Sequence, residues 1–285
     1  MTFLAPGQEP PEDLVAALPA AVKPHPQANA RGVDVAVVGA HPDDVEAACG
    51  GTIAALGALG YRVAIIDLTD GEPTPGSASV DQRLEEAHNA ADALGAAYRR
   101  ILSLPNRRLF DSFEARVALA SEFRRLRPRV VIGFGNRTPL ASPDHDAAMH
   151  LTDAAVFYSR LSKWDEHFGG LPTHVVSRQL YFRIPLEPVA AFSTDASITM
   201  DISAHLEAKL ASIRCYASQF ERRPYVFERI TAAAVMCGAA AGYAAGEAFT
   251  SPRPIGTQDL LRAVLGDGSQ AAALQSLFVD PSGQV

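Results

Sequence analysis

Apolar runs alternate with amphipathic segments through the first part of the chain. Runs of about four to eight apolar residues are typical of strands covered on both faces, and they occur at 33–40, 62–68, 101–104 and 130–134. Apolar residues at helical spacing predict helices between and after these runs, at 52–59, 82–94, 113–126 and 145–161. The order of these elements predicts successive β-α-β units.

Such units build an α/β fold, here a Rossmann-like, mostly parallel sheet with helices on both faces. Right-handed crossovers then bring the loops after the strands to one edge of the sheet, where ligands bind in open α/β folds. The pattern is less regular after residue 170. Strands at 179–184 and 197–202 and helices at 204–219 and 228–245 predict a smaller C-terminal α+β part.

Proline and polar residues mark the two ends of the chain. We expect residues 1–32 to form a proline-rich arm, residues 33–262 to form one domain, and residues 263–285 to form a loose tail. No uncharged apolar stretch reaches the roughly 18 residues that a membrane-spanning helix needs. Early acidic residues and frequent prolines are unlike a signal peptide, so we expect a cytoplasmic protein that does not bind membranes.

Charge and cysteine content exclude several classes of protein. The net charge of −7 argues against a nucleic-acid-binding protein, because such proteins normally carry a basic patch. The three cysteines, Cys49, Cys215 and Cys237, are far apart and form no C-x-x-C pair. Neither a zinc ribbon nor a disulfide framework is therefore expected, and a reducing compartment is the simplest interpretation.

The first predicted strand is followed by chemically active side chains instead of glycines. A dinucleotide-binding fold needs a glycine-rich turn at this point, whereas this chain has H-P-D-D at 41–44. A histidine and a carboxylate are good ligands for a zinc-like divalent metal, and of two adjacent carboxylates one can bind metal while the other acts as a base. His145 follows the strand at 130–134 and is the best candidate for a third ligand at the same sheet edge. Taken alone, the histidines could be structural and the aspartates a helix N-cap.

The sequence also resembles the PIG-L, or LmbE-like, family of zinc-dependent deacetylases over residues 33–262. Within that family it is most similar to the bacillithiol-biosynthesis branch, which deacetylates N-acetylglucosaminyl malate. The H-P-D-D motif in this setting is specific to the family. The matching segments are A-H-P-D-D-V-E-A-A-C-G-G-T at 40–52, D-L-T-D-G-E at 67–72, R-L-E-E-A at 83–87, L-R-P-R-V-V-I at 126–132, P-D-H at 143–145, Y-A-S-Q-F at 216–220 and G-E-A-F at 246–249.

The resemblance implies a metal centre and a base. His41, Asp44 and His145 would bind Zn²⁺, although another divalent metal would also suit these ligands. Asp43 would be the general base that takes a proton from the metal-bound water. The reaction would be hydrolysis of the N-acetyl group of an N-acetylglucosamine conjugate, such as a precursor of a thiol cofactor, and its partner would be a small amino-sugar substrate.

The resemblance also assigns supporting residues. Arg83 matches an arginine that contacts substrate, Ser142 lies at a substrate-facing position, and Asp144 would support the metal ligands from behind. Glu72 and Glu86 match as well, and a structural role for them is an equal alternative. Family members are often homo-oligomers, so we expect a homo-oligomer here.

The second motif departs from the family. The family usually has R-H-P-D-H, whose first histidine stabilises the oxyanion or acts as an acid, but this chain has Ala141 and Ser142 in place of the Arg-His pair. Loss of one oxyanion donor lowers the rate about a hundredfold or more in other enzymes. Arg137, His150 or His174 could replace the histidine. Otherwise the substrate differs, as for an amidase or a natural-product-tailoring deacylase, or the chain is a metal-containing carbohydrate-binding protein with weak catalysis.

Overall fold

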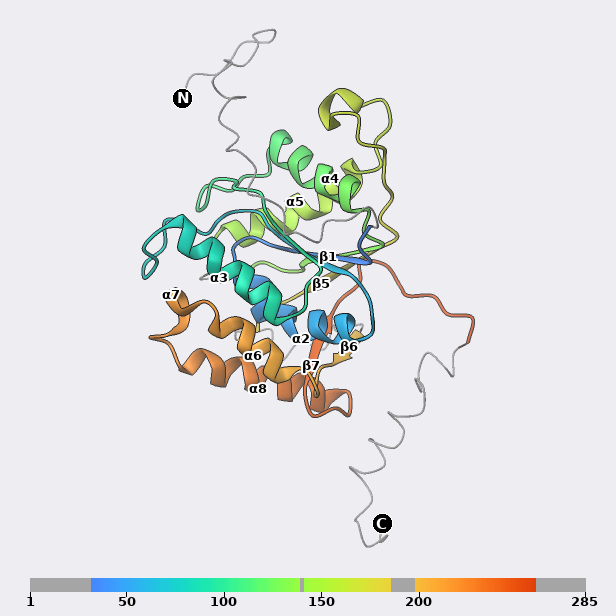
Figure 1. The fold of residues 1–285 in the computed structure, drawn as a ribbon. Coiled ribbons are helices and arrows are strands. Elements are labelled where there is room, and N and C mark those ends of the chain that lie inside the picture. Colours follow the sequence, from blue (N-terminus) through green and yellow to red (C-terminus); the bar gives the residue numbers. More distant parts are fainter. Residues whose placement is uncertain (1–31, 139–140, 186–197, 260–285) are drawn as a thin grey trace, which may run out of the picture.

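The computed structural model describes residues 32–138, 141–185 and 198–259. Its centre is a five-stranded parallel sheet in the order β3-β2-β1-β4-β5 (Figure 1). The strands are β1 (Val35–Gly39), β2 (Val63–Asp67), β3 (Tyr98–Ile101), β4 (Val130–Phe134) and β5 (Arg178–Phe182). β1 and β2 are fully buried, as their continuous apolar runs predict. The strand order reverses at β1 and β4, and this reversal is where ligands bind in such sheets.

Two pairs of helices cover the sheet, one pair on each face (Figure 1). α2 (Asp44–Ala58) and α3 (Val80–Ala93) lie on one face, whereas α4 (Phe113–Leu126) and α5 (Asp144–Tyr158) pack against each other on the opposite face. A short 3₁₀ turn, η1 (Asp165–Phe168), follows α5. The predicted α/β fold with helices on both faces is therefore confirmed.

The C-terminal part adds a third layer outside α2 and α3 (Figure 1). It consists of α6 (Leu206–Arg214), α7 (Ala217–Phe220), α8 (Tyr225–Ala240) and an antiparallel pair, β6 (Ile198–Asp201) and β7 (Gly246–Phe249). This arrangement confirms the predicted smaller α+β part. Residues 1–31 of the predicted arm and the whole predicted tail lie outside the described residues, so the domain boundaries stay a prediction.

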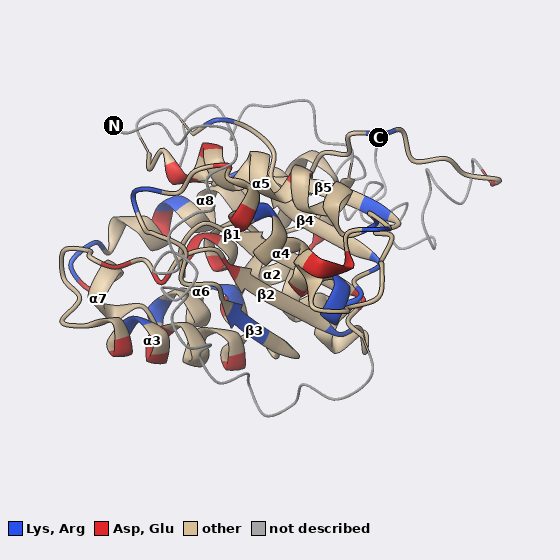
Figure 2. Ribbon diagram, turned by 90° about the horizontal axis from the view of Figure 1, so that it is seen from above, with Lys and Arg blue, Asp and Glu red and all other residues tan. Residues whose placement is uncertain are grey.

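The prediction for β3 was shifted by three residues, because Arg99 and Arg100 made the real strand appear polar. Figure 2 shows these arginines in blue on β3. Arg99 is buried, donates two hydrogen bonds of 2.7 and 2.9 Å to the Asp67 carboxylate, and also pairs with Glu46. A buried arginine is tolerated when its charge is paired and hydrogen-bonded in this way. The loop after β3 therefore begins at residue 102.

The first helix was also predicted wrongly, because α2 begins eight residues before the expected start at 52. The two glycines just before residue 52 lie inside α2, directly after a non-helical residue, Cys49 (φ −144°, ψ 24°). Glu247 of β7 accepts hydrogen bonds from the backbone N–H groups of Gly51 (3.1 Å) and Thr52 (2.7 Å). The second half of α2 is thus capped by a distant carboxylate, which no local pattern reveals.

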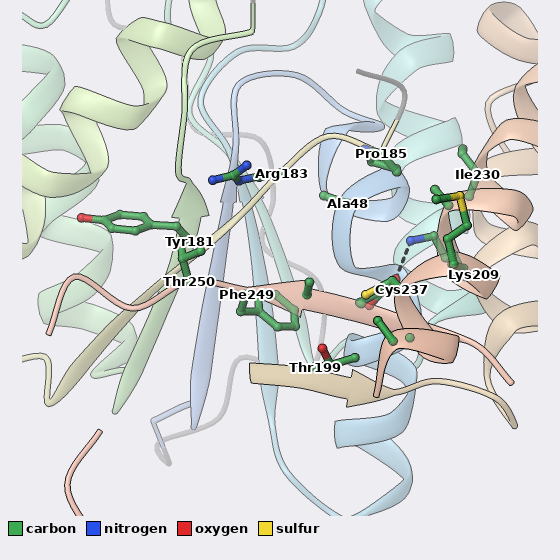
Figure 3. Close-up of a pocket in the computed structure, with 17 residues that line it drawn as sticks. Ala48, Tyr181, Arg183, Pro185, Thr199, Lys209, Ile230, Cys237, Phe249 and Thr250 are labelled. Carbon is green, nitrogen blue, oxygen red and sulfur yellow. Dashed lines mark hydrogen bonds and ion pairs between the residues drawn. The ribbon is translucent and has the colours of Figure 1, made fainter. Parts of the chain in front are cut away.

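Lys209 of α6 pairs with this same carboxylate of Glu247, and both side chains are buried. Figure 3 shows Lys209 among the residues that line a pocket between α8 and β7. The ion pair ties α6 and β7 to the start of the second half of α2. The C-terminal layer therefore fixes the helix that begins at the predicted metal site.

Two more predictions for the C-terminal part were wrong. The helix expected at 204–219 is divided into α6 and α7, because the chain turns at Tyr216, whose hydroxyl donates to the buried Glu46 carboxylate (2.8 Å). The helix expected at 228–245 begins and ends earlier and is followed by β7, a strand that was not predicted. Among the described residues, no helix is long and apolar enough to cross a membrane. Cytoplasmic location and homo-oligomerisation stay predictions.

Candidate metal centre and active site

The turn between β1 and α2 carries the H-P-D-D motif at the carboxyl edge of the sheet. Asp43 lies in this turn with φ 117°, a backbone conformation that non-glycine residues rarely adopt. The Asp44 carboxylate accepts hydrogen bonds from the backbone N–H groups of Ala40 (3.1 Å) and His41 (2.9 Å). These bonds fix the turn, and strain of this kind is concentrated at functional sites.

Three side chains from two distant segments form the candidate metal centre. Nδ1 of His41 lies 3.4 Å from Oδ2 of Asp44, and Nε2 of His145 lies 3.3 Å from Oδ1 of Asp44. The potential ligand atoms of the three residues all lie within 4.8 Å of one another. Two imidazoles and one carboxylate are a typical ligand set for catalytic zinc. The structure thus brings together the three ligands that the sequence predicts.

His145 is held by its surroundings at the start of α5. Its ring stacks on Phe134 of β4 with centroids 4.7 Å apart, and its Nδ1 lies 2.9 Å from the Thr138 hydroxyl. Thr138 is buried. A partner on the second ring nitrogen fixes the orientation of a ligating histidine, and here it leaves Nε2 directed at Asp44.

Asp144 supports the other histidine. Its Oδ2 lies 3.2 Å from Nε2 of His41 and also accepts the backbone N–H of Arg107 (2.6 Å). Its Oδ1 accepts the backbone N–H of Leu109 (3.3 Å). Asp144 therefore connects the loop after β3 to the candidate metal centre, in the supporting position expected from the sequence.

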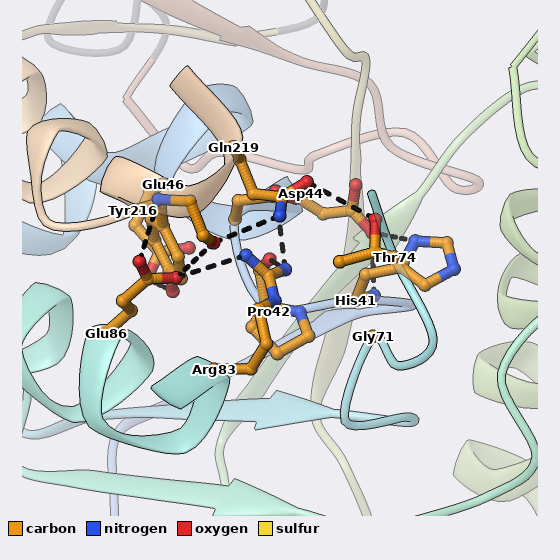
Figure 4. Close-up of polar contacts among 12 residues, drawn as sticks. His41, Pro42, Asp44, Glu46, Gly71, Thr74, Arg83, Glu86, Tyr216 and Gln219 are labelled. Atoms are coloured by element: carbon orange, nitrogen blue, oxygen red, sulfur yellow. Dashed lines mark hydrogen bonds and ion pairs between the residues drawn. The ribbon is translucent and has the colours of Figure 1, made fainter. Parts of the chain in front are cut away.

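Asp43 lines the same cleft as the metal cluster and lies next to Arg83 of α3, which Figure 4 shows beside Pro42. Nη2 of Arg83 donates to the carbonyl of Pro42 (2.6 Å) and lies 3.6 Å from Oδ2 of Asp43. The guanidinium also lies over the Tyr216 ring, 5.3 Å from its centroid. Burial raises the pKa of Asp43 to about 7, although the Arg83 charge opposes this rise. A carboxylate with a pKa near neutrality is suited to act as a general base.

The pKa values of the three candidate ligands reflect their mutual contacts. Burial disfavours a charged His41, but hydrogen bonds to Asp144 and Asp44 outweigh it and raise the pKa of His41 to about 10. Burial likewise disfavours a charged His145, yet the Asp44 charge raises the pKa of that imidazole. Burial also disfavours the Asp44 anion, but the two histidines hold the pKa of Asp44 well below its usual range. The cluster thus favours the carboxylate form that a metal requires.

These residues face an open cleft. Six of the seven predicted site residues line it, namely His41, Asp43, Asp44, Arg83, Ser142 and His145. Ser142 accepts the backbone N–H of Asp144 (3.3 Å) and has a hydroxyl where the family usually has an imidazole. The cleft therefore gives a substrate access to the metal cluster and to Asp43 together.

The residues considered as replacements for the missing histidine do not line this cleft. Nε2 of His174 donates to the carbonyl of Pro128 (2.7 Å), just before β4 begins and so at the opposite edge of the sheet. Arg137 is exposed, with Nε 3.8 Å from Asp146 Oδ1, and His150 is exposed on α5. Glu86 binds the backbone and hydroxyl of Ser218 (2.9 and 2.6 Å), which is a structural contact.

Several residues at the cleft were missed by sequence reasoning. Asn106 and Arg107 line it from the loop after β3, and Gln219 lines it from α7. The shifted prediction for β3 concealed the first two, since a strand ending at 101 would have directed attention to residues 102–108. The short α7 was hidden inside a longer predicted helix.

A parallel α/β sheet with two histidines, an aspartate and an adjacent acidic base at its carboxyl edge defines a metal-dependent hydrolase. The model of the PIG-L family, described as GlcNAc-PI de-N-acetylase, matches residues 36–156. A 1D-myo-inositol 2-acetamido-2-deoxy-alpha-D-glucopyranoside deacetylase from Saccharomonospora viridis is 30% identical over 233 residues, covering 67% of this chain and 86% of that protein. The chain belongs to the PIG-L family, and it is a metal-dependent N-deacetylase.

Solved structures agree with this assignment. The conserved protein TT1542 from Thermus thermophilus has 34% identity and a TM-score of 0.70, covering 80% of this chain and 98% of that one. The N,N'-diacetylchitobiose deacetylase from Pyrococcus horikoshii has 25% identity and a TM-score of 0.65, covering 76% and 82%. The predicted family is confirmed. The finer prediction of the malate-conjugate branch is not supported, because the curated relatives are named for the inositol glycoside.

Proposed function

We propose that this enzyme hydrolyses the N-acetyl group of an N-acetylglucosamine glycoside, with Zn²⁺ held by His41, Asp44 and His145 and with Asp43 as the base. The observation that carries the proposal is the position of Asp43, next to the ligand cluster and in the same cleft. The names of the relatives support an N-acetylglucosamine glycoside as substrate, and their inositol glycoside is one candidate.

The residues present fit a zinc ion. Their donor atoms are two imidazole nitrogens and one carboxylate oxygen, all within 4.8 Å of one another. Three protein ligands on the floor of an open cleft leave a position free for water or substrate. A zinc ion bound here would lower the pKa of a water molecule and polarise the acetyl carbonyl.

Asp43 would move the protons of the reaction. Its carboxylate removes a proton from the attacking water and, once protonated, returns it to the leaving amine. Arg83 keeps Asp43 in place, because it binds the Pro42 carbonyl in the same turn and lies 3.6 Å from the carboxylate. A pKa of about 7 allows Asp43 to act in both directions near neutral pH.

Ser142 would face the acetyl group from the second motif. Its hydroxyl can donate a hydrogen bond to the developing oxyanion while it accepts the N–H of Asp144. A hydroxyl cannot carry the charge of an imidazolium, so we expect weaker oxyanion stabilisation than the family's histidine provides. We therefore expect an active enzyme with a low kcat.

Acetate release by the zinc-loaded enzyme tests the substrate. The panel contains the N-acetylglucosaminyl inositol glycoside, N-acetylglucosaminyl malate, and free N-acetylglucosamine. We expect both glycosides to be deacetylated with a higher kcat/KM than the free sugar. Equal rates on all three would contradict recognition of a glycoside, and no release from any of them would contradict the proposed substrate class.

A further inference from the structure

Arg107 has a backbone conformation that arginine rarely adopts. It lies in the loop after β3 with φ 60°, in the left-handed region that favours glycine. Its backbone N–H donates to Oδ2 of Asp144 (2.6 Å), which in turn contacts His41. A glycine would make that backbone contact without the steric strain. The arginine side chain therefore needs an explanation beyond the backbone.

Arg107 lies where two cavities meet. It lines the catalytic cleft, and with Asn106 it also lines an adjoining open cavity. The walls of that second cavity come from the loops after β2 and β3, and they include Asp70 and Glu72. A sugar whose acetyl group reaches the metal cluster would have room for its attached group beside Arg107.

The side chain of Arg107 forms no ion pair within the described part of the chain. The two carboxylates that line the cleft are already engaged, Asp43 by Arg83 and Asp44 by the two histidines. In the adjoining cavity Asp70 accepts the N–H of Glu72 (2.9 Å) and Glu72 accepts that of Thr74 (3.1 Å), so both keep their negative charge, and Arg108 lines the same cavity. No ion pair joins Arg107 to a described carboxylate, and its side chain is exposed.

A second arginine lines the same cleft from the C-terminal layer. Arg229 of α8 lines the cleft, and its guanidinium lies over the Tyr225 ring, 5.1 Å from the centroid. An aromatic face supports a cation but does not neutralise it. Arg107 and Arg229 thus add positive charge to a cleft whose carboxylates are already engaged.

We propose that Arg107 is a substrate-binding residue that selects amino-sugar conjugates with a carboxylate or phosphate on the group attached to the sugar, with Arg229 as a second contact. This inference rests on the proposed function and narrows its substrate class. Arginine binds both anions through two parallel N–H donors. The inositol glycoside of the relatives is neutral, so this selectivity would distinguish the present enzyme from them.

The variant Arg107→Gly tests this role without disturbing the backbone, because glycine tolerates φ 60° and retains the N–H that Asp144 accepts. Arg127→Gly is a matched control. Arg127 also has a positive φ (54°) and carries the same charge, but it caps the end of α4 and donates to the carbonyl of Thr173 (3.4 Å), away from the cleft. Arg107→Lys keeps the positive charge but lacks the two parallel N–H donors of a guanidinium.

The experiment compares acetate release from N-acetylglucosaminyl malate and from its neutral dimethyl ester, with N-acetylglucosamine 1-phosphate as the phosphate arm. We expect the wild-type enzyme and Arg127→Gly to prefer the malate conjugate by about tenfold or more in kcat/KM, as one charge-assisted contact predicts. Arg107→Gly should lose this preference, mainly through KM, and Arg107→Lys should regain part of it. The better of the two anionic substrates identifies the anion as carboxylate or phosphate.

Two results would overturn the inference: equal use of the malate conjugate and its ester by the wild-type enzyme, or a preference that survives in Arg107→Gly. A binding measurement separates this failure from failure of the proposed function. N-acetylglucosamine 1-phosphate is titrated into Asp43→Asn with and without Arg107→Gly, which requires no turnover. An approximately tenfold weaker Kd in the double variant supports the role of Arg107 even if no acetate is released, and an unchanged Kd contradicts it.

Discussion

Arg83 and Asp43 lie side by side in the cleft, with Nη2 of the guanidinium 3.6 Å from Oδ2 of the carboxylate and 2.6 Å from the carbonyl of Pro42. Arg83 thus binds the backbone just before the candidate base and places a positive charge beside its carboxylate. Arg83 lies in α3 and is 2% exposed, so its side chain is enclosed by the protein. It connects α3 to the H-P-D-D turn.

Replacing Arg83 by Gln should shift the acid side of the pH–rate profile upward. The Arg83 charge lowers the pKa of Asp43 against the effect of burial, so its removal lets that pKa rise above about 7. The base is then protonated at neutral pH, and kcat at pH 7 should fall by roughly tenfold. kcat measured from pH 5 to 9 checks this. If the acid limb of the pH–rate profile has the same midpoint in the variant and the wild type, the titration of Asp43 does not cause that limb.

Zinc binding should release protons and become tighter as pH rises. In the metal-free protein the pKa of His41 is raised to about 10, so the imidazole is protonated at neutral pH. Zinc must displace that proton, and fewer protons remain to be displaced as pH approaches 10. Calorimetry in two buffers of different ionisation enthalpy measures the released protons. His150→Gln, a change outside the cleft, should release as many, and pH-independent affinity in the wild-type protein would contradict the account.

Thr138→Val should weaken zinc binding with little effect on folding. The threonine hydroxyl lies 2.9 Å from Nδ1 of His145, and valine has the same shape without the hydroxyl. Loss of such an orienting partner lowers metal affinity by roughly 10–100-fold. Competition with a chelator measures the Kd, and Thr138→Ser should retain most of the affinity. Equal Kd values for all three proteins would mean that this contact does not orient the ligand.

Arg99→Met should destabilise the fold strongly. It would leave the buried carboxylates of Asp67 and Glu46 without their shared cation, and such a loss costs about 3–5 kcal/mol. Arg100→Met is a control on the same strand, because Arg100 pairs at 3.5 Å with Glu122 and is partly exposed. The free energy of unfolding in urea should fall much less for the control. Comparable losses of unfolding free energy in the two variants would show that the buried ion pairs of Arg99 are not a special source of stability.

The sequence predicted the sheet and the clustering of the three candidate ligands because strand runs and the residues near their ends are local signals. β1 and β4 are continuous apolar runs; His41 and Asp44 come at the turn after β1, and His145 lies at the start of α5, the next helix after β4. Parallel strands place such residues at one edge, so their meeting could be anticipated. This expectation needed only the order of strands and loops, without any interatomic distance.

The errors arose where distant contacts override local patterns. Arg99 is polar in sequence but buried against Asp67, which displaced the predicted β3 and concealed the loop that contains Arg107. Gly51 remains helical because Glu247, far away in the chain, binds its N–H. A single sequence carries no direct sign of either contact.

Acetate release by zinc-loaded wild-type protein and by Asp43→Asn is the most direct test of the central claim, that Asp43 is the base of a zinc-dependent deacetylase. The substrates are the N-acetylglucosaminyl inositol and malate conjugates, and the zinc content of both proteins is measured in parallel. The account predicts equal zinc content and a loss of about a hundredfold or more in kcat for the variant. A variant that binds zinc and retains the wild-type kcat would contradict it.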